Sequence, residues 1–241
     1  MLSTIVPMAV IVTCLWLAVA LYLLRRKAGG FFPYVWFILL GALLPVVVNL
    51  YLKAPFIRWL AQAGQVPAGQ GLAGTPIWFL IALWLVSPVF EEAIKSAPGV
   101  FPPGSRLLDT PKRALWLGLS LGFGFGLGEV WYIAWSVAVS GMTIGLPWTA
   151  FTGFAIERAL VIPAHAMMTA IAVLGFQRRG GWAVWGYLIA VGLHALLNSG
   201  AMLAQLGMIQ MGWAEIPLLA GLALMAFLLV RIYRRSPQPA A

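Results

Sequence analysis

The chain has 241 residues, of which 62% are hydrophobic and only 9% carry a charged side chain. Soluble domains carry roughly 25% charged residues, so this composition excludes a water-soluble globular protein and indicates that lipid surrounds most of the chain. The formal net charge of +9 does not indicate nucleic-acid binding, because the basic residues are grouped at the ends of apolar runs and do not form one basic face.

Seven apolar runs are long enough to cross a bilayer as helices, which takes about 20 apolar residues each. The sequence therefore predicts an all-α, polytopic membrane helix bundle with about seven transmembrane helices, forming a single integral membrane domain over residues 1–241. The predicted spans lie near residues 4–24, 32–52, 76–99, 115–140, 154–176, 182–205 and 214–231.

The distribution of Lys and Arg predicts the orientation of these spans. Eleven of the fifteen basic residues follow the first, third, fifth and seventh spans, in the segments 25–27, 106–113, 178–179 and 231–235. Basic residues are enriched in cytoplasmic loops, so we expect the N-terminus outside and the C-terminus in the cytoplasm. Residues 53–75 then form the longest outside loop, with Lys53 and Arg58 in it. The first half of this loop is a candidate for a short amphipathic helix on the membrane surface.

Glutamates and histidines occur where the bilayer core is expected. Glu91 and Glu92 fall in the third predicted span, Glu129 in the fourth, and His165 and His194 in the fifth and sixth. At a rise of about 1.5 Å per residue, these spans place their polar groups within a turn or two of mid-membrane. A charged side chain at the bilayer centre costs about 2.5–3.5 kcal/mol even on a lenient insertion scale. We therefore expect four consecutive helices to bring these groups together in one functional site.

Further polar residues accompany these groups at helical spacing. Asn198 follows His194 by four residues, and Lys95 follows Glu91 by four, so each pair shares a helix face. Each pair also has a purely structural interpretation. Glu91 and Lys95 would form an ion pair whose lysine reaches the headgroups, and His194 and Asn198 would hydrogen-bond between helices. The occurrence of such pairs on several helices favours a functional site.

Two other features have local explanations. Glu157 and Arg158 are adjacent near the outer end of the fifth predicted span, where a local charge match is expected. The fourth span begins with a glycine-rich run that no strand precedes, so it does not predict a nucleotide-binding loop. Its G-x-x-x-G series let neighbouring helices approach closely: Gly118–Gly122–Gly126 and Gly124–Gly128.

These residue types permit three kinds of chemistry. Two adjacent carboxylates in a low dielectric should not both ionise, and a carboxylate tuned in this way is a general base for water. His194 and Asn198 offer donors to a developing oxyanion, so the set suffices to hydrolyse a peptide bond without a covalent nucleophile. The same residues could bind zinc in a metal-dependent protease or form the ion or proton pathway of a carrier. Composition and spacing alone do not separate the three.

The order of the motifs resembles the PrsW family, which is related to the CAAX-protease and bacteriocin-processing (CPBP) superfamily of glutamic intramembrane proteases. The motifs lie in the segment 76–205: Glu91-Glu92-x-x-Lys95, Gly128-Glu129-x-x-Tyr132, Arg158…His165-x-x-x-Thr169 and His194-x-x-x-Asn198. PrsW proteins usually have Asn after the second-motif glutamate, where this chain has Val130. The stretch from Ile156 to His165 looks like the YhfC-type branch of the same superfamily.

The resemblance implies an intramembrane endopeptidase of a bacterial-type cell membrane, acting on a membrane-protein or membrane-anchored peptide substrate. It also implies a role for each site residue: Glu91 as the base that activates water, Glu92 as its support, His165 as an aid to the water, His194 and Asn198 as the oxyanion site, and Glu129 as a conditional member. We expect that the protein uses no cofactor, and we favour this expectation over a zinc site. We also expect no nucleic-acid partner. The alternative functions are an ion- or proton-coupled carrier and a metal-dependent intramembrane protease.

Overall fold

The computed structural model describes residues 5–27, 31–66, 75–141 and 145–236. Seven of its helical segments are long and apolar enough to cross a membrane, and no strand occurs among the described residues. This confirms the prediction of an all-α, multi-pass membrane helix bundle. The α-helices are α1 (Val6–Lys27), α2 (Phe32–Val47), α3 (Ala54–Ala63), α4 (Ile77–Ser96), α5 (Pro111–Val139), α6 (Thr152–Arg178), α7 (Gly181–Gln205) and α8 (Glu215–Arg234).

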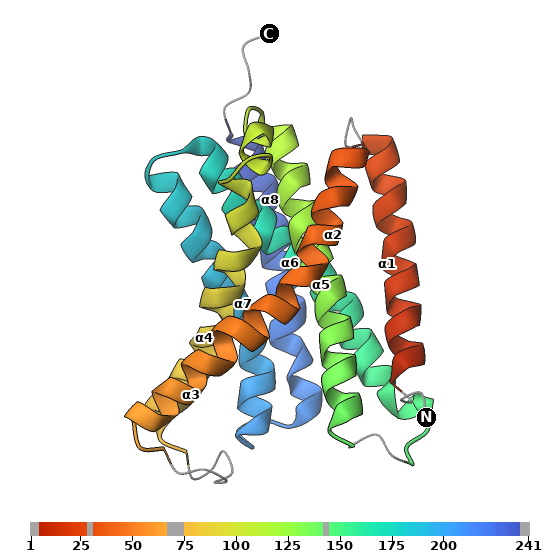
Figure 1. The fold of residues 1–241 in the computed structure, drawn as a ribbon, viewed down its shortest axis with the longest axis vertical. Helices are drawn as coiled ribbons and strands as arrows, with labels where there is room; N and C mark the ends of the chain where they lie inside the picture. Colours follow the sequence, from red (N-terminus) through yellow and green to blue (C-terminus); the bar gives the residue numbers. More distant parts are fainter. Residues whose placement is uncertain (1–4, 28–30, 67–74, 142–144, 237–241) are drawn as a thin grey trace.

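The second membrane-crossing helix continues well beyond its predicted end. α2 passes through a π-helical turn (Val48–Lys53) directly into α3, so one uninterrupted helix crosses the bundle obliquely (Figure 1). The prediction that an outside loop begins at residue 53 was therefore wrong. This turn is wider than an α-helical turn, because the amide of Ala54 donates to the carbonyl of Asn49 five residues back. The expected helix in the first half of this loop is present as α3, and the second half lies largely in residues 67–74, outside the described residues.

The centre of the bundle is the contact between α5 and α6, which are the most buried of the membrane-crossing helices. The glycines of α5 make this contact close. A Cβ atom at Gly122 would lie 2.2 Å from the carbonyl oxygen of His165 on α6, and one at Gly128 would lie 2.1 Å from that of Ala42 on α2. The two G-x-x-x-G series therefore face two different neighbours, which confirms the predicted close helix approach.

The ends and the outer surface of the bundle fit a membrane protein. α1, α6 and α8 end at the same end of the bundle, where the connection from α4 to α5 also lies, and α1 begins at the other end (Figure 1). The four basic segments are thus on one side, as the predicted alternation requires. Large apolar side chains such as Leu15, Leu43, Trp185 and Phe227 are exposed on the outside of the bundle, where lipid would cover them.

Candidate active site

The adjacent carboxylates of α4 are both buried but have different surroundings. Consecutive residues of an α-helix lie about 100° apart around its axis, so Glu91 lines a cavity while Glu92 faces α7. Lys95 is fully buried and donates to Oε1 of Glu92 at 2.5 Å. The interpretation of Lys95 as the partner of Glu91, with its ammonium at the headgroups, was therefore wrong. Lys95 belongs to the interior of the site.

The cation that pairs with Glu91 comes from another helix. Nζ of Lys53, at the end of the π-helical turn, lies 2.7 Å from Oε1 of Glu91. Oε2 of Glu91 has no hydrogen-bond partner among the described residues, and it lies 3.8 Å from Nε2 of His194. Lys53 was missed because the predicted span stopped one residue before it. The available signal was a single lysine directly after an apolar run.

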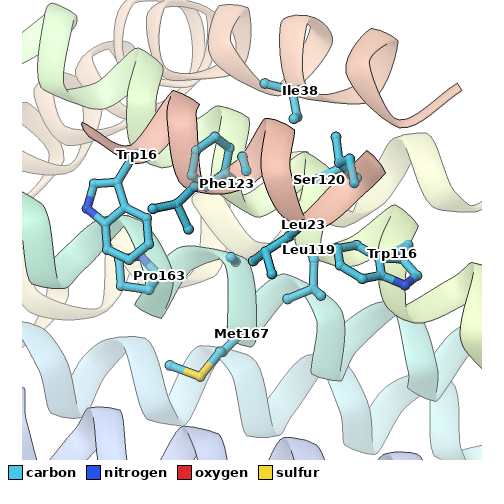
Figure 2. Close-up of a pocket in the computed structure, with 13 residues that line it drawn as sticks. Trp16, Leu23, Ile38, Trp116, Leu119, Ser120, Phe123, Pro163 and Met167 are labelled. Carbon is cyan, nitrogen blue, oxygen red and sulfur yellow. The ribbon is translucent and has the colours of Figure 1, made fainter. Parts of the chain in front are cut away.

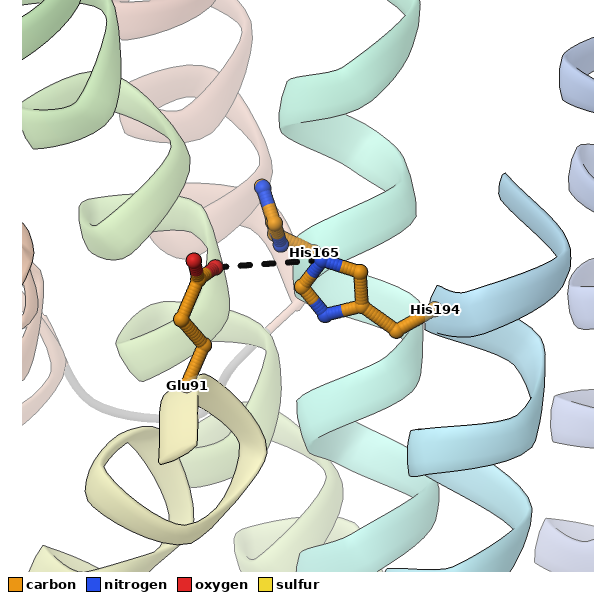
Figure 3. Close-up of side chains that lie close together, drawn as sticks. All are labelled: Glu91, His165 and His194. Atoms are coloured by element: carbon orange, nitrogen blue, oxygen red, sulfur yellow. Dashed lines mark ion pairs between the residues drawn. The ribbon is translucent and has the colours of Figure 1, made fainter. Parts of the chain in front are cut away.

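The two histidines of the chain lie side by side, with ring centroids 5.3 Å apart. Figure 3 shows His165 on α6 and His194 on α7 converging with Glu91 of α4. Nδ1 of His194 is 2.7 Å from Oε1 of Glu92. A carboxylate only accepts, so Nδ1 donates to Glu92, and Nε2 is the ring nitrogen that faces Glu91.

His165 has partners at both ring nitrogens. Its Nδ1 lies 2.9 Å from Nζ of Lys95, and its Nε2 lies 3.1 Å from Oε2 of Glu129. Because an ammonium group only donates, Nδ1 accepts and Nε2–H donates to Glu129. His165 therefore links the carboxylate of α5 to the lysine of α4.

Glu129 is also bonded to a residue that the sequence did not place in the site. Nη1 of Arg158 donates to Oε2 of Glu129 at 2.8 Å, and Nη2 donates to Oε1 of Glu157 at 2.6 Å. The predicted local match between Glu157 and Arg158 is confirmed, but it does not describe Arg158 fully. Its guanidinium is mostly buried and connects α6 to the site carboxylate of α5.

The remaining motif residues have three different positions. Asn198 lines the same cavity as Glu91, one helical turn beyond His194. Thr169 is buried against α5. Tyr132 lines a separate cavity between α1, α2 and α5, so the structure does not bring it to the glutamates.

A cavity of about 470 Å³ joins the polar groups. Its inner part is lined by Lys53, Glu91, Glu129, Arg158, His165, His194 and Asn198. It continues to Gly153 at the start of α6, Gln205 at the end of α7 and Glu215 at the start of α8. These helix ends lie at the end of the bundle where α1 begins (Figure 1). The twelve residues from Gly153 to His165 correspond to roughly 18 Å of helix. The cavity thus reaches deep into the bundle from one end.

Another cavity has no charged side chain among its described lining residues. It measures about 180 Å³, lies between α1, α5 and α6, and is lined mainly by apolar side chains such as Trp16, Phe123 and Met167 (Figure 2). No titratable side chain is among its described lining residues. Its lining suits an apolar group and offers nothing for hydrolysis.

The three inward-facing carboxylates are each bonded to one cation. The pairs are Glu91 with Lys53, Glu92 with Lys95, and Glu129 with Arg158. A buried charge is tolerated when it is paired and hydrogen-bonded, and it is costly otherwise. Among the described residues, these pairs let the bundle hold three carboxylates at its centre.

The donor types of a zinc site are present. Glu91, His165 and His194 each offer a ligand atom, and these atoms lie within 4.8 Å of one another. Two histidines and a glutamate form a known catalytic zinc set. The hydrogen bonds, however, do not suit a metal ion. Both nitrogens of His165 are occupied, one of them by the ammonium of Lys95, and Glu91 is already paired with Lys53. Oε2 of Glu91 has no hydrogen-bond partner among the described residues, but two ammonium groups adjoin the set, and their charge disfavours a dication in this arrangement.

Comparisons with known proteins identify a family. A family model described as "PrsW family intramembrane metalloprotease" matches residues 33–231. No curated protein and no solved structure matches the chain. The matched segment contains α2 except its first residue, α3 to α7 and most of α8, and with them all the residues that line the inner cavity. The chain therefore belongs to the PrsW family of intramembrane proteases.

Proposed function

We propose that this protein is an intramembrane endopeptidase in which Glu91 activates the water that hydrolyses a peptide bond. The observation that carries this proposal is the free oxygen of Glu91. Oε2 has no partner among the described residues, is buried, and lies 3.8 Å from Nε2 of His194 at the inner end of the cavity. This separation is too long for a direct hydrogen bond and suits two acceptors that share one water.

Glu92 supports the site from behind. It does not line the cavity, and its Oε1 accepts hydrogen bonds from both Lys95 and His194. A carboxylate on Nδ1 fixes the tautomer and orientation of an imidazole. We therefore assign Glu92 the role of holding His194 so that Nε2 faces the water.

The hydrolytic step then follows from general-base chemistry. The water oxygen attacks the carbonyl carbon of the substrate, and Glu91 Oε2 takes a proton from the water. The amide of Asn198, one turn toward the cavity mouth, donates to the oxygen that becomes negative. When the carbon–nitrogen bond breaks, Glu91 returns the proton to the amine, which leaves one carboxylate product and one amine product.

This assignment divides the roles differently from the resemblance. A neutral His194 that donates to Glu92 has no proton at Nε2, so it orients the water and does not bind the oxyanion. His165 donates to Glu129 and lines the same cavity beside His194. We assign His165 and Glu129 to the wall of the site, where they keep Lys95 and Arg158 in place.

The alternatives are weaker on two grounds. Membership in a protease family does not favour an ion- or proton-coupled carrier. A metal-dependent protease is the second candidate, because the Glu91, His165 and His194 ligand atoms are close together and the description of the family names a metalloprotease. The ammonium groups of Lys53 and Lys95 speak against it. We therefore propose that no cofactor takes part.

The substrate and the orientation are also proposals. The cavity opens toward the end of the bundle opposite the basic segments. With the N-terminus outside and the C-terminus in the cytoplasm of a bacterial-type membrane, a membrane-protein or membrane-anchored substrate would reach Glu91 from the outer side. Relationship to the CPBP superfamily, or to its YhfC-type branch, stays a prediction.

The proposal is tested with purified protein and a single-span peptide. Glu91→Gln keeps the size of the side chain and removes the base, so we expect turnover to fall by at least about 100-fold, with normal insertion and folding. Asp109→Asn is the matched control, because Asp109 is exposed and pairs with Arg113 outside the site. It should cleave as the wild type does. A Glu91→Gln protein with near wild-type turnover would refute the role of Glu91.

A further inference from the structure

The long helix that crosses the bundle changes its geometry next to the site. Between α2 and α3, the residues Val48–Lys53 form a π-helical turn. Such turns are rare, cost regular hydrogen-bond geometry, and occur frequently at functional sites. The turn ends on Lys53, whose ammonium binds Glu91.

The turn changes which residue of this helix faces inward. Leu44 and Val48 are buried at the α-helical spacing of four, and the next inward side chain is Lys53, five residues on. Tyr51 is 71% exposed and Leu52 is 38% exposed. A regular α-helix would bring Leu52 to the place that Lys53 occupies. The extra residue therefore exchanges a leucine for a lysine opposite Glu91.

The contact made by Lys53 determines how Glu91 is presented. Its Nζ binds Oε1 at 2.7 Å, and the lysine side chain is 13% exposed, so the ion pair is largely shielded from water. With Oε1 held, the carboxylate has a fixed orientation in which Oε2 is free and adjoins Nε2 of His194. A carboxylate without this contact would rotate about its terminal torsion, which has a broad energy profile.

We propose that Lys53 is a positioning residue for Glu91 and that the π-helical turn places it there. The inference rests on the proposed function of Glu91. It extends the site to a helix that carries none of the four sequence motifs. The lysine also supplies the one cation bonded to Glu91 among the described residues, so the turn contributes both orientation and charge balance.

Kinetics of three variants test this inference with the single-span peptide. Lys53→Met should lower kcat about 10- to 100-fold, since a displacement of a reacting group by about 1 Å costs up to about 100-fold, with KM changed less than about twofold. Lys53→Arg keeps a cation in reach of Glu91 and should recover kcat to within about tenfold of wild type. Lys112→Met is the matched control at an exposed lysine and should leave both constants unchanged. A merely structural role would lower the folded fraction and leave kcat per folded molecule intact.

A residue exchange tests the register of the turn directly. The double variant Leu52→Lys/Lys53→Leu keeps composition and charge but moves the ammonium by one position to the outer face. We expect it to lose as much kcat as Lys53→Met does, and it decides the question if the methionine variant does not fold. Wild-type kcat in either folded variant, together with an inactive Glu91→Gln, would overturn the inference and leave the proposed function standing. An active Glu91→Gln would overturn both.

Discussion

Replacing Lys95 by methionine isolates the energetic role of the buried charges. Lys95 and Glu92 are both fully buried, and Nζ of Lys95 lies 2.5 Å from Oε1 of Glu92. The same ammonium group lies 4.7 Å from the ring centroid of Phe125. Methionine fills a similar volume without the charge, so the variant leaves the Glu92 carboxylate buried without its cation, with the hydrogen bond from His194 as its remaining contact. Removing one partner of a buried ion pair costs about 3–5 kcal/mol. We expect the free energy of unfolding to fall by that amount.

The assay is equilibrium unfolding in mixed micelles, followed by tryptophan fluorescence. Arg113→Met is the matched control, because it breaks the ion pair between Arg113 and Asp109. Both of these side chains are about half exposed. Exposed pairs contribute about 0.2–1 kcal/mol, so this variant should unfold almost as the wild type does. In Lys95→Met/Glu92→Leu no charge is left behind, and at least half of the lost stability should return.

Two results would refute this reasoning. Equal losses in Lys95→Met and Arg113→Met would mean that burial does not set the cost of breaking these pairs. A double variant as unstable as Lys95→Met would mean that packing of the lysine stem, and not the stranded charge, is what the substitution removes.

Further predictions concern packing, catalysis, metal dependence and topology. Gly122→Ala should destabilise the protein by about 1–3 kcal/mol in the same unfolding assay, because its Cβ would lie 2.2 Å from a carbonyl oxygen of α6, whereas Gly192→Ala has open space and should change stability by less than about 1 kcal/mol. Asn198→Ala should lower kcat by about 10²–10³ with little change in KM, as for the loss of an oxyanion donor; an unchanged kcat would remove Asn198 from the mechanism. Activity should survive strong chelators, and elemental analysis should find no stoichiometric zinc; zinc that is lost in parallel with activity would establish the metal-dependent alternative. Reporter fusions after Arg179 and after Met211 should report opposite sides of the membrane, and the same side for both would contradict the span order.

The outline of the bundle could be predicted because it depends on local properties. The length of an apolar run and the spacing of glycines act within one helix, whatever the rest of the chain does. The predicted spans therefore agree with α1 and with α4 to α8 to within a few residues. The position of Glu91, Glu129, His165 and His194 along their helices could be predicted for the same reason, since the rise per residue alone sets it.

The partners of these groups depend on more than depth. Lys95 is four residues from Glu91 and three from Glu92, and both spacings allow a contact along a helix. In the structure Lys95 binds Glu92, because α4 is rotated so that Glu92 faces α7. There His194 binds the same oxygen of Glu92, Oε1, that Lys95 binds. No property of α4 by itself selects between the two carboxylates.

The sequence by itself thus determined a seven-span helical membrane protein with acidic residues and histidines at mid-depth, because hydrophobicity and helical rise are read within each segment. The tertiary structure alone decided the contact of Lys53 with Glu91 and the contact of Arg158 with Glu129. Lys53 reaches Glu91 only because a π-helical turn adds one residue to an oblique helix. Arg158 reaches Glu129 only because glycines bring α5 close to α6. Rotation, tilt and separation of helices come from packing between segments, which no single segment encodes.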